Sequence, residues 1–299
     1  MFPVLAALPA IAEPRVDPVL RQMVPPRASS LVGVHMDRVR PTGFYRRIIE
    51  SGKLSHWEKF VRETGFNPGR DVRELLFANT FWGRVLVARG RFTVPAEAPS
   101  GATLVRHGDY NVWSYGNSGF CILDNTLAAA GDMRSLLATL DEWTSGTHHA
   151  ADPFLQRARF ADSTTVLWGV ARAFDGLLAD TVTGSTGGVD FSKIFRRLTN
   201  IWFEMDFSAG LRARVGGSTA TEQDAVNLRD TIRGLVGIGR LTVPENQPDV
   251  LRMWDGITAE PESRSLALKV DVPVELVEQL LKLAGAVPGR DSALGFGAR

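Results

Sequence analysis

Two groups of residues have types and spacings that suggest chemistry. His148 and His149 are followed by Asp152, and two imidazoles with a carboxylate can hold a zinc ion. Adjacent histidines point in different directions on a helix or strand, however, whereas metal sites usually space them by a helical turn or by two residues of a strand. The group also falls at the junction between two similar stretches of the chain. We therefore interpret it as an exposed linker and predict no metal site.

The second group lies earlier in the chain. His107 and Asp109 could act as a base and its orienting carboxylate, with Ser114 or Ser118 as the nucleophile. The sequence around Ser118 (GNSG) lacks the G-x-S-x-G spacing of a nucleophile elbow and is typical of a hairpin turn. We therefore assign no catalytic residue.

Glycine-rich segments give no cofactor site. Residues 184–188 (GSTGG) lack the G-K-[ST] ending of a phosphate loop, so we predict a flexible loop there. Gly234, Gly237 and Gly239 (GLVGIG) fall at the end of a predicted helix, where they permit close packing or a C-terminal cap. Their spacing does not indicate a dinucleotide fold, and we predict no cofactor.

Composition excludes several classes of protein. The net charge is +1, without the concentrated basic face that nucleic acid binding requires. Cys121 is the single cysteine, so the chain can form no internal disulfide, and its apolar context (FCIL) favours a small core residue over a catalytic thiol. The seven tryptophans could line a groove, but their recurrence at similar places in two stretches favours packing.

The N-terminus has features of an export signal. Residues 2–12 (FPVLAALPAIA) are apolar and end in an A-x-A pattern, but no basic residue precedes them and two prolines interrupt them. We expect export to an extracytoplasmic location, periplasmic or secreted, with an uncleaved apolar arm as the alternative. Eleven residues are too few to span a bilayer, and no other segment is long and apolar enough. We expect a soluble mature protein and no contribution of residues 2–12 to the folded core.

Elements along the chain repeat in the same order. A short helix at residues 16–24 precedes the first strand. Each of two stretches then has a strand, a helix, a β-hairpin and a strand that leads into a helix. Their landmarks are residues 29–36, 77–81, Trp113 and the helix after Asp132 in one, and residues 163–170, 203–207, Trp254 and the helix after Pro273 in the other.

This repetition predicts an α+β fold of two similar halves. Each half would be an antiparallel or mixed sheet with helices packed on one side, and the halves would meet across an interface or a continuous sheet. We divide the chain into residues 1–27 (signal-like segment and arm), 28–147 (first half), 148–288 (second half) and 289–299 (disordered tail). We expect residues 28–143 and 162–284 to superpose.

The order of strand, helix, hairpin, tryptophan, strand and helix resembles that of a class of large uncharacterised bacterial domains. The endings LAAAG at residues 127–131 and LALKV at residues 266–270 carry the same resemblance. Such domains are usually exported and have no established activity, so the resemblance implies an α+β fold and carries over no functional residue. We predict a non-enzymatic binding or structural domain of the cell envelope whose protein or small-molecule partner the sequence does not identify. The alternatives are a hydrolase with its site between the halves and an accessory subunit of a larger assembly.

Overall fold

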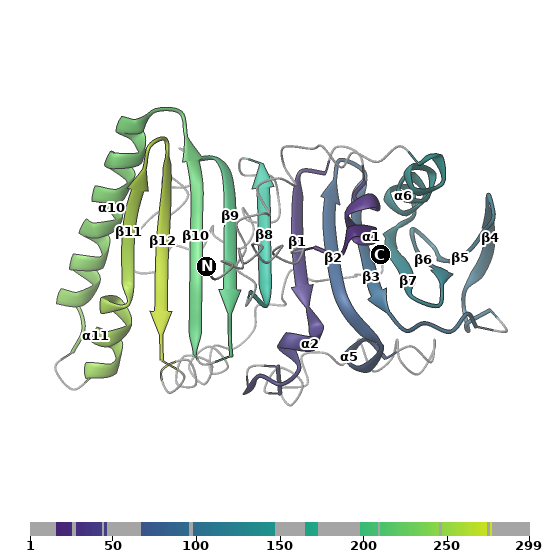
Figure 1. Cartoon of the computed structure of the whole chain (residues 1–299), viewed down its shortest axis with the longest axis horizontal. Coiled ribbons are helices and arrows are strands. Elements are labelled where there is room, and N and C mark those ends of the chain that lie inside the picture. Colours follow the sequence, from purple (N-terminus) through teal and green to yellow (C-terminus); the bar gives the residue numbers. More distant parts are fainter. Residues whose placement is uncertain are drawn as a thin grey trace, which may run out of the picture.

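Twelve strands form one open antiparallel sheet (Figure 1). The computed structural model describes residues 16–25, 28–43, 45–46, 67–95, 98–146, 165–172, 198–208, 210–244, 247–273 and 276. Across the sheet the strand order is β11-β12-β10-β9-β8-β1-β2-β3-β7-β6-β5-β4. Every pair of described neighbouring strands runs antiparallel, and the predicted α+β class is confirmed.

The strands are β1 (Ser30–His35), β2 (Val72–Thr80), β3 (Gly83–Gly90), β4 (Thr103–His107), β5 (Tyr110–Tyr115), β6 (Ser118–Asp124), β7 (Leu127–Asp132), β8 (Leu167–Arg172), β9 (Leu198–Asp206), β10 (Leu211–Thr219), β11 (Ile257–Glu262) and β12 (Ser265–Val272). The described helices are α1 (Pro18–Gln22), α2 (Met36–Val39), α5 (Pro68–Asp71), α6 (Met133–Ser145), α10 (Glu222–Leu241) and α11 (Pro248–Asp255). None of them is long and apolar enough to cross a membrane.

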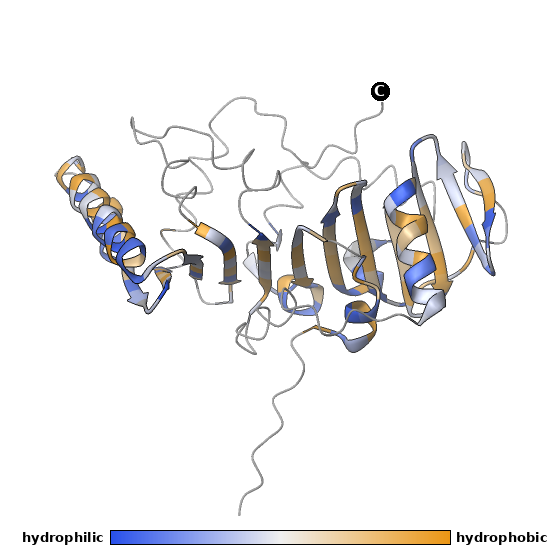
Figure 2. Cartoon of the chain, turned by 90° about the horizontal axis from the view of Figure 1, so that it is seen from above, coloured by the Kyte–Doolittle hydropathy of each residue, from blue (hydrophilic) through white to orange (hydrophobic). Residues whose placement is uncertain are grey.

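Helices cover both faces of the sheet, which corrects the prediction that they pack on one side. We call the face that carries Leu31, Leu76 and Val87 face A; α1 and α6 pack on it. The opposite face, face B, is covered by α10 over β11 and β12 and by α2 beside β2. Figure 2 shows the strands from above as a single layer.

A glycine and an aspartate shape the β2–β3 hairpin and its contact with β7. Gly83 has φ +127°, which only glycine adopts readily, and a Cβ there would lie 2.2 Å from the Asp132 carboxylate. That carboxylate accepts a hydrogen bond of 2.7 Å from the backbone N–H of Arg84. Asp132 precedes α6 as predicted, but its side chain forms no cap hydrogen bond to the helix because it pairs with β3 instead.

The sequence predicts a helix over about residues 221–237 with Thr221 and Asp224 as a capping box, and α10 begins with this cap but extends beyond residue 237. Thr221 accepts a hydrogen bond from the backbone N–H of Asp224 at 3.1 Å, and its hydroxyl donates to the Asp224 carboxylate at 2.6 Å. The helix continues to Leu241, so Gly234, Gly237 and Gly239 lie inside it. Gly239 permits a close approach, because a Cβ there would lie 2.5 Å from the Trp254 ring of α11.

The short helix predicted at residues 16–24 is confirmed as α1. The sequence also predicts a turn at residues 67–69, where the structure instead has Asn67 as the N-cap of α5. Several other predictions lie outside the described residues. They concern residues 2–12, most of the helices at 42–51 and 57–61, the loop at 183–188, most of the helix at 274–283 and the tail at 289–299.

Candidate functional site

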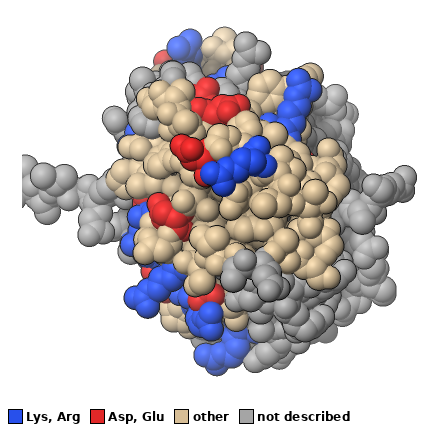
Figure 3. Space-filling view, turned by 90° about the vertical axis from the view of Figure 1, so that its right-hand side faces the viewer, with Lys and Arg blue, Asp and Glu red and all other residues tan. Residues whose placement is uncertain are grey.

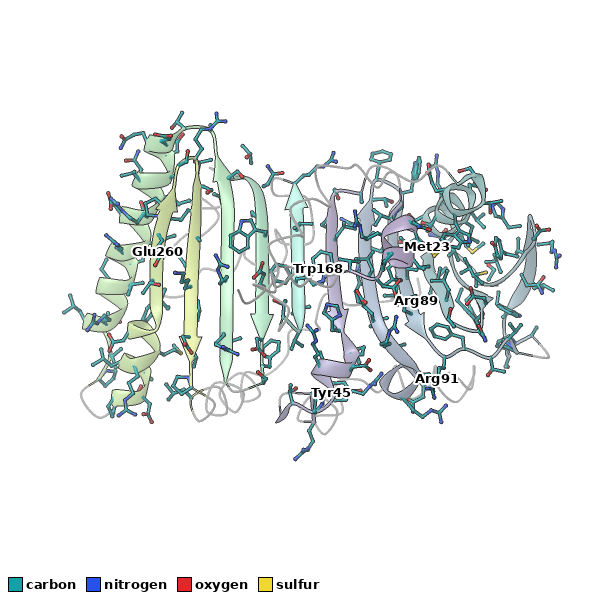
Figure 4. All side chains as sticks on the ribbon, in the orientation of Figure 1. Met23, Tyr45, Arg89, Arg91, Trp168 and Glu260 are labelled. Atoms are coloured by element: carbon teal, nitrogen blue, oxygen red, sulfur yellow. The ribbon has the colours of Figure 1, made fainter. Side chains whose placement is uncertain are left out.

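Charged side chains gather at one end of face A. His35 pairs with Glu74 between β1 and β2, and Glu74 pairs with Arg89 between β2 and β3. Because residues paired in register lie side by side on the same face, these three side chains form a row across neighbouring strands. Figure 4 shows Arg89 below Met23, at the part of the sheet that α1 crosses.

Asp17, which precedes α1, contacts this row from the α1 side of face A. It is the N-cap residue of α1, and its carboxylate accepts a 2.8 Å hydrogen bond from the backbone N–H of Val19. The same carboxylate accepts hydrogen bonds from Arg73 at 2.7 Å and from Arg89 at 3.1 Å. The backbone N–H of Asp17 donates to the Glu74 carboxylate at 3.2 Å. We call Asp17, His35, Glu74, Arg73 and Arg89 the acid–base cluster.

Glu74 is the group in this cluster whose protonation is most perturbed. Its side chain is 9% exposed, and His35 Nδ1 lies 3.8 Å from its carboxylate. Burial raises the pKa of Glu74 to about 7, and the negative charge of Asp17 adds to this effect; the N–H of Asp17 and the charges of Arg73 and Arg38 oppose it. Glu74 can therefore gain or lose a proton near neutral pH.

The cluster fastens α1 to the sheet rather than presenting reactive groups to a substrate. Arg89 Nε donates a hydrogen bond to the Asp17 carboxylate. Arg89 Nη1 donates to the carbonyl and the hydroxyl of Thr126, in the turn before β7. Asp17 and Glu74 each expose only 9% of their side chains. Among the described residues, no group of three His, Cys, Asp or Glu side chains is arranged to hold a metal ion.

Face B carries a different feature, an apolar row that crosses all twelve strands. In register from β4 to β11 its members are Leu104, Trp113, Phe120, Ala130, Leu86, Phe77, Val32, Gly169, Phe203, Val215, Leu268 and Ala259. We call it the apolar row. No polar residue interrupts it, so one apolar strip runs across the whole sheet.

The middle of the apolar row is not fully covered. Leu86, Phe77, Val32, Phe203, Val215 and Leu268 are each partly exposed. Side chains in protein cores usually pack without such gaps. At the β11 end the row meets a pocket of about 150 Å³ between α10 and β11, lined by Ile232, Arg233, Val236, Ile257, Thr258 and Ala259.

The histidine that we considered as a base has a different partner from the one that the sequence suggested. His107 Nε2 lies 2.7 Å from the Asp141 carboxylate of α6, in a pair that is largely exposed. Asp109 is exposed in the turn between β4 and β5, and the Ser114 hydroxyl donates to the backbone carbonyl of Gly116. The described contacts therefore assemble no catalytic triad from these residues.

The other candidates are placed as follows. His148, His149, Asp152 and residues 184–188 lie outside the described residues. Cys121 is buried in β6, and burial raises the pKa of its thiol to about 12, in keeping with a core residue.

The described tryptophans mostly pack within the fold. Trp113 stacks on Phe120 with ring centroids 5.0 Å apart, and Trp143 donates a hydrogen bond to the Tyr110 hydroxyl. Trp168 is buried at the centre of the sheet (Figure 4). Trp202 lies under the Arg214 guanidinium at 5.6 Å, a cation–π contact on face A.

Charges on the side of the molecule that Figure 3 presents are of both signs. Lys, Arg, Asp and Glu side chains intermix there around a broad area with neither. That view shows no concentrated basic surface.

The acid–base cluster is not among the sites predicted from the sequence, although β2 carries a signal for it. Glu74 alternates with Leu76 and Ala78 in β2, and residues two apart in a strand share a face. The alternation thus predicts a carboxylate at the edge of an apolar face, and a carboxylate in that position needs compensating groups. The partners Asp17 and Arg89 could not be found from local spacing.

No protein-family model and no curated protein matches the sequence. Solved structures of TP0453, a Treponema pallidum protein of unknown function, do resemble this chain. Crystal form III has a TM-score of 0.50 at 9% identity and covers 90% of this chain and 98% of its own. Crystal form I has a TM-score of 0.49 at 9% identity, covering 90% and 97%. The chain thus has an α+β fold similar to that of a bacterial protein of unknown function, and the likeness shows no specific activity.

Proposed function

We propose that this chain is a non-enzymatic, exported binding protein that holds an elongated apolar ligand against face B. One observation carries the proposal: the apolar row crosses every strand, and its middle members remain partly exposed. Burying apolar surface is the main favourable term in binding as in folding, so an incompletely covered apolar strip favours an apolar occupant.

The dimensions of the strip support an elongated ligand. From Leu86 on β3 to Leu268 on β12 the row crosses six strand spacings, each about 4.8 Å, or roughly 29 Å in all. Its β12–β11 end adjoins the pocket under α10, lined partly by Ile257 and Ala259 of face B. A long hydrocarbon chain matches this shape better than a compact molecule does.

Two further expectations belong to the same proposal. The apolar residues 2–12 favour export, and the strand order favours an origin by duplication of residues 28–147 and 148–288. On one side of the β1–β8 pair the order is β1-β2-β3-β7-β6, and on the other it is β8-β9-β10-β12-β11. Gly83 and Gly210, at the β2–β3 and β9–β10 turns, have φ values of +127° and +128°.

Titration with a fluorescent fatty acid tests the binding proposal. Val215→Asp places a charge in the apolar row and should weaken binding at least tenfold, because a carboxylate buried against a hydrocarbon chain is unfavourable. Arg214→Asp is the matched control, because Arg214, which precedes Val215 in β10, points to face A and its exchange should leave affinity unchanged. Equal affinity of the two variants, or no saturable binding to the wild type, would refute the proposal.

A further inference from the structure

The first described segment, residues 16–24, lies across face A and packs on the apolar residues of the strands there. Val16, Leu20, Met23 and Val24 are all buried in the same core cluster as the strands beneath them. Within this segment the N–H groups of Arg21, Met23 and Val24 bond to carbonyls of the segment itself. Asp17 attaches the segment to the sheet through hydrogen bonds with Glu74, Arg73 and Arg89.

Asp17 lies among several hydrogen-bond donors. Three donors reach its carboxylate: the N–H of Val19 and the guanidinium groups of Arg73 and Arg89. Hydrogen bonds from charged donors stabilise a carboxylate strongly. A second negative charge beside Asp17 would be repelled.

Glu74 is that second group. Five charged or titratable side chains from the surrounding elements bear on it: Asp17 beside α1, His35 of β1, Arg38 of α2, Arg73 of β2 and Arg89 of β3. None of the arginines donates a hydrogen bond to Glu74 in the described contacts. Arg38 donates to the carbonyl of Thr165, Arg73 to Asp17, and Arg89 to Asp17 and Thr126.

Among the described residues, the backbone N–H of Asp17 donates a hydrogen bond to Glu74 at 3.2 Å. This hydrogen bond favours the ionised form of Glu74, but the burial of the carboxylate opposes ionisation more strongly. The side chain of Glu74 is 9% exposed, so an ionised Glu74 is poorly hydrated. It is also repelled by the nearby Asp17 carboxylate. Burial and the Asp17 charge hold the pKa of Glu74 at about 7, so the change falls near neutral pH.

We propose that residues 16–24 form a pH-sensitive latch that is closed over face A while Glu74 is protonated and loosens when Glu74 releases its proton to water. The latch can respond to a single ionisation because it is short. The entropy lost on ordering nine residues offsets most of the gain from burying four apolar side chains. The cost of burying an ionised Glu74 therefore decides whether the latch stays closed, and its loosening uncovers apolar residues of the same core cluster, such as Leu31 and Leu76.

Hydrogen–deuterium exchange of the full chain, measured by mass spectrometry at pH 6.0 and pH 8.5, tests this inference. Exchange times are scaled for the intrinsic rate at each pH, and peptides from residues 16–24 are compared with peptides from β6. In the wild type we expect protection of residues 16–24 to fall at least tenfold between the two values, while protection of β6 is unchanged.

Glu74→Gln mimics the neutral acid and should keep the latch protected at both pH values. Asp17→Asn removes the charge that binds Arg73 and Arg89, so this variant should be loosened already at pH 6.0. Glu260→Gln is the matched control: Glu260 is an exposed carboxylate of β11 paired with Lys269, and its exchange should leave the wild-type response intact.

Three results would overturn the latch. They are an equal fall of protection in Glu74→Gln, no fall in the wild type, and a fall that β6 shares, which would mean global opening. Because the readout is exchange at residues 16–24, it does not depend on whether face B binds a ligand.

Discussion

Replacing Gly33 by alanine should destabilise the protein at the centre of its sheet. Gly33 lies in β1 between Leu76 of β2 and Trp168 of β8. A Cβ on Gly33 would lie 2.2 Å from two atoms of the Trp168 indole, which is 1% exposed. The ring therefore cannot keep its position when the methyl group is added.

The magnitude follows from how far the ring must move. A forced extra methyl group in a packed core costs about 1–3 kcal/mol, whereas losing a buried tryptophan altogether costs about 3–5 kcal/mol. We expect Gly33→Ala to lower the unfolding free energy by about 2–4 kcal/mol. At this chain length that is a fall in Tm of roughly 5–15 °C, measurable by circular dichroism and by urea titration.

A double-mutant cycle tests whether the loss of stability comes from the clash with Trp168. In a Trp168→Ala background the added methyl group meets a cavity rather than an indole, so Gly33→Ala should cost less than about 1 kcal/mol there. Gly234→Ala is the control, since nothing lies within 4 Å of a Cβ at that position of α10, and it should stabilise the helix. The same loss from Gly33→Ala with and without Trp168 would refute the steric explanation.

Four further outcomes are expected. Because the pKa of Glu74 is raised from 4.5 to about 7, the wild type should lose stability as pH rises from about 4.5 to about 7. Glu74→Gln should therefore be about 2–3 kcal/mol more stable than the wild type at pH 8 but not at pH 4, by urea titration. Gly237→Ala, in open space on α10, should raise the unfolding free energy by about 0.5–1 kcal/mol. His107→Asn should change stability by no more than about 1 kcal/mol, because its partner Asp141 is 68% exposed. A fragment of residues 28–147 should aggregate in size-exclusion chromatography, because β1 would become an exposed apolar edge; a monomer that unfolds cooperatively would contradict this.

Elements with clear local sequence patterns could be predicted from the sequence. The β2–β3 hairpin has apolar runs on either side of Trp82-Gly83, and α10 has a capping box at Thr221 and Asp224. Strand β11 (ITAEPE) was missed, because it contains Pro261 and no apolar run. Its place at the edge of the sheet explains why the proline is tolerated, since an edge residue need not donate to a neighbouring strand.

The acid–base cluster depends on register, which local spacing cannot supply. Asp17 and Glu74 are 57 positions apart, and Asp17 and Arg89 are 72 apart. Only the pairing of β1, β2 and β3 brings Glu74 between His35 and Arg89. The pairing of His107 with Asp141 likewise depends on α6 packing against the sheet after β7, so the nearer Asp109 was the misleading choice.

The two faces of the sheet differ in a way that bears on where a ligand can bind. On face A the row that passes through Leu76, Gly33 and Trp168 continues into Glu204, Arg214 and Lys269. This face therefore changes from an apolar core to a polar surface beyond β8, where Arg214 and Lys269 are exposed. Face B stays apolar over the same strands, through Phe203, Val215 and Leu268. A strand that is buried on one face alternates apolar and polar residues. Strands β9, β10 and β12 show this alternation, whereas β2 and β3 are apolar on both faces. A continuous apolar ligand site can consequently extend across the β1–β8 junction on face B alone, because on face A the latch and α6 cover the apolar part and charge occupies the rest.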